Sequence, residues 1–145
     1  MTLQTLNRFM ENSELNECFF LVIDSLESRY EGPTEKPVKE GSSADSPFIG
    51  KTPQECQALL GELQAKSPHL EISTRFFAIL DDQSPDNVLL VDDYEEDFGT
   101  VRVAFELGME LLMCYVEALR SIAEDNSTAK WKYDGVLRDY DSGFV

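Results

Sequence analysis

The sequence RFFAILDDQSPDNVLLVDDYEEDFGTVRVAF, residues 75–105, decides the fold. It contains three short apolar runs, at residues 75–80, 87–91 and 100–105. Runs of this length, rich in β-branched and aromatic residues and separated by polar turn residues, are typical of β-strands. The connection at 83–86 carries Ser, Pro and Asp, and the next connection is acidic and ends in Gly99. Because both connections are short, the stretch predicts an antiparallel meander of three strands.

Two helices are predicted before this stretch. Residues 2–15 place apolar side chains at near-helical spacing, which indicates a short amphipathic helix. A second helix begins at Thr52, because Glu55 completes a capping box and Pro53 occupies the first helical position. The Ser-Pro pair at 67–68 is expected to end it.

The longest helical pattern follows the strands, at residues 106–124. One apolar stripe runs along it, formed by Leu107, Leu111, Tyr115, Leu119 and Ile122. This spacing predicts a single amphipathic helix that packs on the sheet. The polar residues 125–127 are expected to end the helix.

Three further segments complete the predicted domain. The apolar run at 18–23 predicts a central strand, and residues 29–51, dense in Pro, Gly and Ser, predict a mobile surface loop. The tail at 131–145 is apolar enough that we expect it to pack on the sheet or its edge. Asp134 and Gly135 indicate a turn within it, and Trp131 is interpreted as a lid over the core.

Length and composition favour one globular domain spanning residues 1–145. The chain is 42% apolar and 28% charged, which is typical of a folded rather than a disordered protein. Together with the strand and helix patterns, this predicts an α+β fold. We expect a mainly antiparallel sheet of four to five strands packed against two to three helices.

The charge balance restricts the possible partners. Twelve basic against 28 acidic residues give a formal net charge of −16. Such a field repels nucleic acid and anionic lipid, so we expect a protein partner with a basic surface and neither nucleic-acid nor membrane binding. The early apolar run is too short for a signal sequence or membrane span, and the three cysteines are widely spaced. These features predict a cytoplasmic or nuclear protein.

The residue types argue against most catalytic sites. His69 is the single histidine, which excludes multi-histidine metal sites within one chain, and it is interpreted as a surface loop residue. The glycines never fall at the spacing of a phosphate-binding loop. We therefore expect no cofactor, no metal site and no catalytic residue.

Acidic residues concentrate between the second and third strands and around the preceding turn. Eight lie within residues 81–97 with no Lys or Arg among them: Asp81, Asp82, Asp86, Asp92, Asp93, Glu95, Glu96 and Asp97. Three interpretations are open: solvated turns, a contact surface for a basic partner, or a carboxylate site for Mg²⁺ or acid–base chemistry. The second interpretation assigns partner binding to Asp92, Asp93, Tyr94, Glu95, Glu96, Asp97 and Phe98, because aromatic side chains there add contact area to the charge.

The leading hypothesis is a non-enzymatic protein-binding module, such as an inhibitor or antidote-like factor, that engages a basic partner. The alternatives are a small carboxylate-dependent hydrolase or metal-dependent enzyme, and a self-associating structural protein. Divalent-ion titration would separate the first two, because a metal site gives a saturable, localised response.

A family resemblance covers mainly residues 50–140. The segments that carry it are Gly50–Glu55, Phe76–Asp81, Asn87–Asp92, Val101–Val103 and Asp134–Arg138. Together they resemble a family of small uncharacterised acidic α+β domains. Since that family has no established activity, the resemblance implies the fold and no catalytic residue. It also implies that Asp92, Arg102 and Arg138 belong to one ion network.

Overall fold

The computed structural model describes residues 3–13, 21–23, 26, 30, 34, 46–81, 86–94 and 97–139. Within these ranges the side chains of Leu3, Tyr94, Asp97 and Phe98 are not described. Most of the loop predicted at 29–51 lies outside the described residues, as do residues 140–145 of the tail.

Four strands form one sheet in the order β1-β2-β3-β4: β1 (Phe76–Ile79), β2 (Asn87–Tyr94), β3 (Asp97–Ala104) and β4 (Val136–Leu137). The first three are antiparallel, with Ala78 opposite Leu90 and Leu90 opposite Val101. The tail returns as β4, which pairs with β3 in parallel. The predicted meander, the predicted packing of the tail and the α+β class are therefore confirmed.

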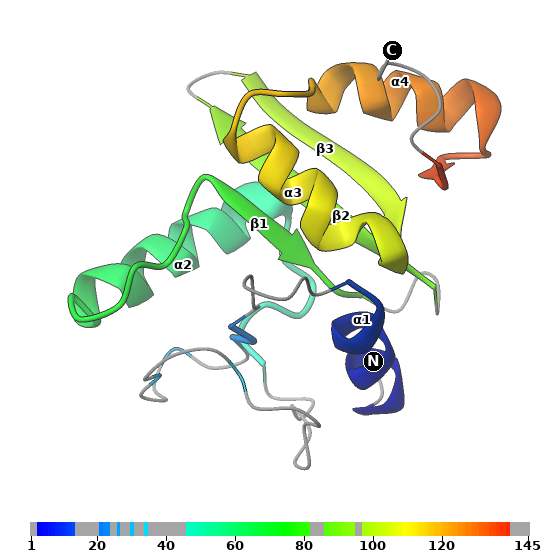
Figure 1. Ribbon diagram of the computed structural model, residues 1–145. Helices are drawn as coiled ribbons and strands as arrows, with labels where there is room; N and C mark the ends of the chain where they lie inside the picture. The colour runs from blue at the N-terminus through cyan, green and yellow to red at the C-terminus, as the bar shows by residue number, and fades with distance from the viewer. Residues whose placement is uncertain are drawn as a thin grey trace.

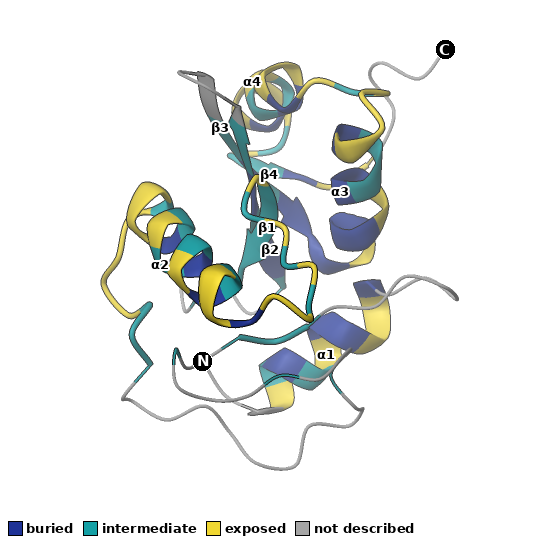
Figure 2. Cartoon of the chain, turned by 90° about the vertical axis from the view of Figure 1, so that its left-hand side faces the viewer, coloured by how far each residue is buried: buried dark blue, intermediate teal, exposed yellow. Residues whose placement is uncertain are grey.

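Helices cover both faces of this sheet: α1 (Leu3–Ser13), α2 (Pro53–Lys66), α3 (Gly108–Val116) and α4 (Ile122–Lys132). Figure 2 shows α2 on one side of the sheet and α3 and α4 on the other, with α1 below (Figures 1 and 2). Because strand side chains alternate between faces, Val88 and Leu90 join the core that α1, α3 and α4 cover. Val91, next along β2, is completely buried on the α2 face.

The capping box predicts the start of α2 correctly. The Thr52 hydroxyl accepts a hydrogen bond from the Glu55 amide at 3.2 Å, and the Glu55 carboxylate accepts one from the Thr52 amide at 2.9 Å. Pro53 takes the first helical position. This pattern satisfies amides that would otherwise have no partner at the helix start.

The single helix predicted at 106–124 is wrong, because the chain turns a corner there. A 3₁₀ turn (η1, Phe105–Leu107) leads into α3, and α3 ends where Ala118 adopts a left-handed conformation with φ 57°. The Ala118 amide donates to the Tyr115 carbonyl and the Leu119 amide to the Cys114 carbonyl, which is a Schellman ending. Leu119 of the predicted stripe is consequently 65% exposed.

Residues 125–127, expected to end that helix, lie inside α4 instead. Ser121 begins α4, since its hydroxyl accepts a hydrogen bond from the Glu124 amide. The sequence contains this signal, a serine followed three residues later by glutamate. The apolar spacing continues across the corner and conceals it.

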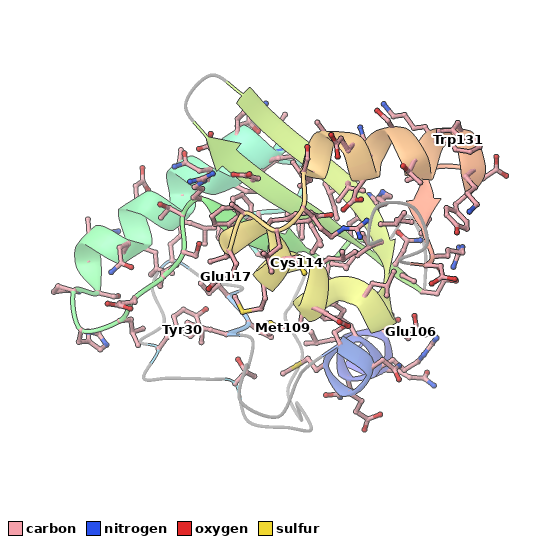
Figure 3. The ribbon with its side chains drawn as sticks, turned by 45° about the horizontal axis from the view of Figure 1, so that its top comes forward. Tyr30, Glu106, Met109, Cys114, Glu117 and Trp131 are labelled. Carbon is pink, nitrogen blue, oxygen red and sulfur yellow. The ribbon has the colours of Figure 1, made fainter. Side chains whose placement is uncertain are left out.

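Two smaller predictions also fail. Residues 21–23 are not part of the sheet, and the Val22 amide donates to the Thr34 hydroxyl at 2.7 Å rather than to a strand; residues 18–20 lie outside the described residues. Trp131 is 76% exposed and is no lid. Ala129 of α4 is completely buried, and Trp131 lies two residues later, about 200° around the helix axis. The Trp131 side chain therefore points away from the core (Figure 3). Among the helices in the described part of the chain, none has both the length and the apolarity to cross a membrane.

Candidate functional site

Of the acidic residues predicted as one cluster, the four whose side chains are described are divided between the two ends of β2. Asp81 and Asp86 flank the β1–β2 connection, whereas Asp92 and Asp93 lie at the far end of the strand. β2 has eight residues, so its ends are roughly 24 Å apart at about 3.4 Å per residue. The four described acids therefore do not lie together on one surface.

Arginines neutralise the acids at the β1–β2 end. The Arg102 guanidinium donates to Asp81 at 3.1 Å and to the Asn87 side-chain oxygen at 3.0 Å. The Asn87 amide group donates to Asp86 at 3.2 Å, and Arg138 donates to the same carboxylate at 3.1 Å. These contacts form one polar network that joins the β1–β2 connection, β3 and the tail.

At the other end, Asp92 accepts a hydrogen bond from the Arg75 Nε at 2.9 Å, and its side chain is 18% exposed. The Asp93 amide donates to the Arg75 carbonyl at 2.8 Å. Of the three residues that the resemblance groups, Arg102 and Arg138 do share a network, but Asp92 belongs to a separate pair. Glu95, Glu96 and the side chains of Tyr94, Asp97 and Phe98 lie outside the description, so partner binding by residues 92–98 stays a prediction.

The nucleophiles and the histidine lie apart. His69 is exposed, and its Nε2 lies 3.0 Å from the Tyr30 carbonyl oxygen, which confirms its interpretation as a surface residue. Burial raises the pKa of the Cys56 thiol, and burial with the nearby Glu110 carboxylate raises that of Cys114. A raised pKa keeps a thiol protonated and weakly nucleophilic. Across the described ranges, no three His, Cys, Asp or Glu side chains gather in a group that could hold a metal ion.

A buried ion pair braces the corner between α3 and α4. The Arg120 Nε donates to Asp125 at 2.9 Å, a second guanidinium nitrogen donates to the other carboxylate oxygen, and the Tyr115 hydroxyl donates to Asp125 at 2.8 Å. The Arg120 and Asp125 side chains are 5% and 6% exposed. Burial first, and then the Asp125 charge, raise the Tyr115 pKa far above its usual range. Sequence patterns gave no sign of this cluster, because its members belong to two helices and their connection.

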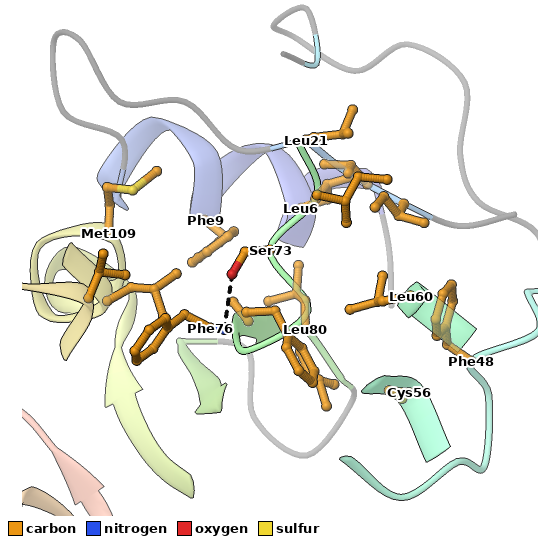
Figure 4. A pocket seen from close by; sticks show the side chains of 18 of the residues that line it. Leu6, Phe9, Leu21, Phe48, Cys56, Leu60, Ser73, Phe76, Leu80 and Met109 are labelled. Carbon is orange, nitrogen blue, oxygen red and sulfur yellow. Dashed lines mark hydrogen bonds between the residues drawn. The ribbon is translucent and has the colours of Figure 1, made fainter. Parts of the chain in front are cut away.

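An apolar cavity of about 540 Å³ lies at β1. α1, α2, α3 and residues 76–80 contribute to its wall, together with parts of the segments 21–23, 46–48 and 71–73. The lining includes Leu6, Phe9, Leu21, Phe48, Leu60, Phe76, Leu80 and Met109 (Figure 4). Glu71 is the only charged residue in the described lining. The cavity is therefore an apolar site with an acidic group at one end.

β1 is the edge strand of the sheet, and this cavity follows its open side. In the described part of the chain β1 pairs only with β2. All four of its residues are half-buried. The run Phe76 to Leu80 is apolar at five consecutive positions, which suits a strand covered on both faces. That pattern predicted the strand, but it could not show that the strand would stand at an edge.

A second hollow lies at the end of α4, and its lining includes Trp131, whose exposed side chain is labelled in Figure 3. Lys130, Lys132 and Arg138 are among its lining residues. It is a basic and aromatic surface on an otherwise acidic protein.

Comparisons with protein-family models, curated proteins and solved structures found no match to this chain. The resemblance to a family of acidic α+β domains stays a prediction, and the function rests on the geometry of the site.

Proposed function

We propose that this protein is a non-enzymatic protein-binding module whose binding site is the apolar cavity at β1. The observation that carries the proposal is a cavity of about 540 Å³ that opens along the outer edge of β1, a half-buried apolar strand whose only strand partner in the described part of the chain is β2. Ligand sites in proteins are commonly apolar hollows of about 300–1,000 Å³ with few polar groups. Burial of a partner's apolar side chain in this cavity lowers the free energy of the complex, because the side chain leaves water.

Charge supports a partner with basic residues. The net charge of −16 attracts cationic surfaces over the whole molecule, and Glu71 places a carboxylate in the cavity lining itself. The Asp93 backbone is bonded to Arg75, immediately before β1, so the acidic β2–β3 turn begins beside one end of the cavity. We propose residues 92–98 as the surface that guides the basic part of the partner toward this end.

The alternative of a small carboxylate-dependent or metal-dependent enzyme receives less support. Asp81, Asp86 and Asp92 each form an ion pair with an arginine, so these carboxylates already have a partner in the structure. Within the described residues, the His69 Nε2 contacts the Tyr30 carbonyl oxygen, and no hydrogen bond joins the ring to the Cys56 or Cys114 thiol.

Selection of peptides from a displayed random library tests the proposal. We expect the enriched peptides to combine consecutive apolar residues with Lys or Arg. Val116 and Leu119 offer a matched pair of variants, since both are exposed apolar residues near the end of α3 and only Val116 lines the cavity. Val116→Asn should weaken peptide binding about five- to tenfold, and Leu119→Asn should leave it unchanged.

Two outcomes would contradict the proposal. One is a library that yields no peptide above background. The other is a selected peptide that binds both variants as tightly as the unmodified protein, because its site would then lie elsewhere.

The guiding role of the acidic turn has its own test. Charge reversal at Asp93, Glu95 and Glu96 should slow association of a basic peptide and flatten its dependence on salt concentration. Stopped-flow association at two salt concentrations measures both effects. An unchanged rate at low salt would show that residues 92–98 do not guide the partner.

A further inference from the structure

We infer that the cavity binds its partner by strand addition: an extended apolar segment with a basic flank pairs with the open edge of β1 as a fifth strand. The inference rests on the proposed function and specifies how the partner is held. It follows from the backbone of β1, from the two halves of the cavity and from the charges at one end.

The backbone geometry shows which groups of β1 face outward. The Asp93 amide donates to the Arg75 carbonyl at 2.8 Å, which makes these two residues a hydrogen-bonded pair. Such pairs alternate along antiparallel strands, so Phe77 and Ile79 bond to β2. Phe76 and Ala78 therefore direct their amides and carbonyls to the open edge.

The Phe76 amide confirms this assignment. It donates to the Ser73 hydroxyl at 3.0 Å, on the side away from β2 (Figure 4). In the part of the chain that the structure describes, no hydrogen bond occupies the amide or the carbonyl of Ala78. The Ala78 amide and carbonyl are therefore the donor and acceptor on this half-buried apolar edge with which an extended peptide can pair.

The cavity continues across this edge onto both faces of the sheet. Cys56 and Leu60 line it from α2, and Met109 and Leu112 line it from α3. Successive side chains of an added strand point to opposite faces, so one side chain would enter the α2 half and the next the α3 half. The segment that fits is therefore apolar at consecutive positions, unlike a surface strand that alternates with polar residues.

The basic flank belongs at the Phe76 end of β1. Glu71 lines the cavity before the strand begins, and Asp93 is opposite Arg75 just beyond it. Natural edge strands are commonly protected from unwanted pairing by lysine, proline or a bulge. β1, with the sequence Phe-Phe-Ala-Ile, has no such residue. The strand is four residues long and Ser73 occupies the Phe76 amide, so the part of the edge that a partner can pair with is centred on Ala78.

A synthetic peptide tests the inference: two lysines followed by Val-Ala-Val-Leu-Val-Ala, compared with the same peptide N-methylated at every apolar residue. N-methylation retains the side chains and removes the amide donors. Strand addition predicts that the methylated peptide binds at least about 100-fold more weakly. The amide resonance of Ala78 should shift in NMR spectra on titration with the unmodified peptide.

Ala78→Pro tests the same contact from the side of the protein. Proline removes the outward amide and leaves the bonds to β2 intact, because proline is tolerated where an edge-strand amide faces outward. We expect it to weaken peptide binding about tenfold or more with an unchanged far-UV circular dichroism spectrum. Ala78→Val keeps the outward amide but enlarges a side chain that lines the cavity, so it serves as the comparison and should weaken peptide binding less than Ala78→Pro does.

Several results would overturn the inference. If both peptides bind equally and Ala78→Pro binds normally, the cavity receives side chains without strand pairing, and the proposed function alone stands. If the Ala78 amide is already protected from hydrogen exchange in the free protein, a segment of this chain covers the edge. If sedimentation shows a dimer that Ala78→Pro dissociates, the added strand comes from a second copy. If no peptide binds, whether synthetic or selected from the library, the proposed function fails as well.

Discussion

The centre and the edge of the sheet have equally apolar sequences and different burial. In β2 and β3 the inward side chains of Val88, Leu90, Val101 and Val103 are at most 1% exposed. The four residues of β1 are just as apolar, and each remains half-buried. Composition therefore does not decide burial here; the number of neighbouring elements does.

The cause of the difference is the closure of the sheet. β2 has a strand on each side and helices on both faces, and α4 packs so closely on β3 that a Cβ at Gly99 would lie 2.5 Å from the Ile122 side chain. β1 has one neighbouring strand in the described part of the chain, and a cavity follows its other side. Under the proposed function the centre of the sheet supplies stability and the edge supplies binding surface, and four predictions examine this division.

The largest loss of stability is expected when the brace at the α3–α4 corner is broken. Asp125→Ala leaves the Arg120 charge buried without its carboxylate, which should lower the free energy of unfolding by about 3–5 kcal/mol. Urea denaturation measures the change. Glu124→Ala, at the exposed neighbouring position, is the control and should cost less than about 1 kcal/mol. Equal losses in the two variants would show that the buried pair is not a brace.

Leu111 and Leu119 belong to one predicted stripe and differ in the structure. Leu111 is completely buried and Leu119 is 65% exposed. Leu111→Ala should therefore cost about 2–5 kcal/mol, and Leu119→Ala less than about 0.5 kcal/mol. Thermal or urea unfolding of the two variants measures both values. Similar costs would favour one continuous helix at 106–124 over the observed corner.

Tyr115 should make the protein sensitive to alkali. Its folded-state pKa is raised above the usual value, so above about pH 10 the unfolded state loses a proton that the folded state keeps. Stability then falls as pH rises, by about 1.4 kcal/mol per pH unit for this proton. Tyr115→Phe should lower stability by about 1–3 kcal/mol at pH 7, because the hydrogen bond to Asp125 is lost. Above pH 10 the free energy of unfolding of Tyr115→Phe should fall less steeply with pH than that of the unmodified protein, by about 1.4 kcal/mol per pH unit. Urea denaturation at several pH values measures both slopes, and equal slopes would contradict the role assigned to Tyr115.

The sequence predicts local structure correctly where that structure depends only on residues close together in the chain. The three strands of residues 75–105 and the capping box at Thr52 depend on neighbouring residues, and both are confirmed. The corner at Ala118 was missed because the apolar spacing continues through a left-handed residue that is usually glycine. Ser121 and Glu124 carried the signal that could have located it.

The candidate site was less accessible to sequence reasoning. Charge density drew attention to residues 81–97, but arginines distant in sequence pair with Asp81, Asp86 and Asp92. No rule of sequence spacing identifies such partners. The cavity depends on which strand stands at the sheet edge, and strand order is a property of the assembled fold.

The smallest predicted change in stability comes from a comparison of an edge strand and a central strand on the same face of the sheet. Ile79 of β1 and Val91 of β2 both belong to the α2 face, since Phe77 lies opposite Val91 and side chains alternate along each strand. Ile79→Thr keeps a β-branched side chain at a half-exposed position where water can reach the hydroxyl, so it should cost less than about 1 kcal/mol. Val91→Thr places the same hydroxyl where the residue is completely buried, and an unsatisfied hydroxyl there should cost about 1–3 kcal/mol.

Urea denaturation of these two variants, together with the peptide titration, connects stability to binding. If the edge is a binding surface, Ile79→Thr should reduce the free energy of peptide binding more than the free energy of unfolding, because the side chain of Ile79 lines the cavity. Val91 does not line the cavity, so Val91→Thr should reduce the free energy of unfolding more than the free energy of peptide binding. Equal destabilisation by the two threonines would mean that β1 is covered as fully as β2. The distinction between a stabilising centre and a binding edge would then be wrong, since an edge already buried offers a partner no apolar surface to cover.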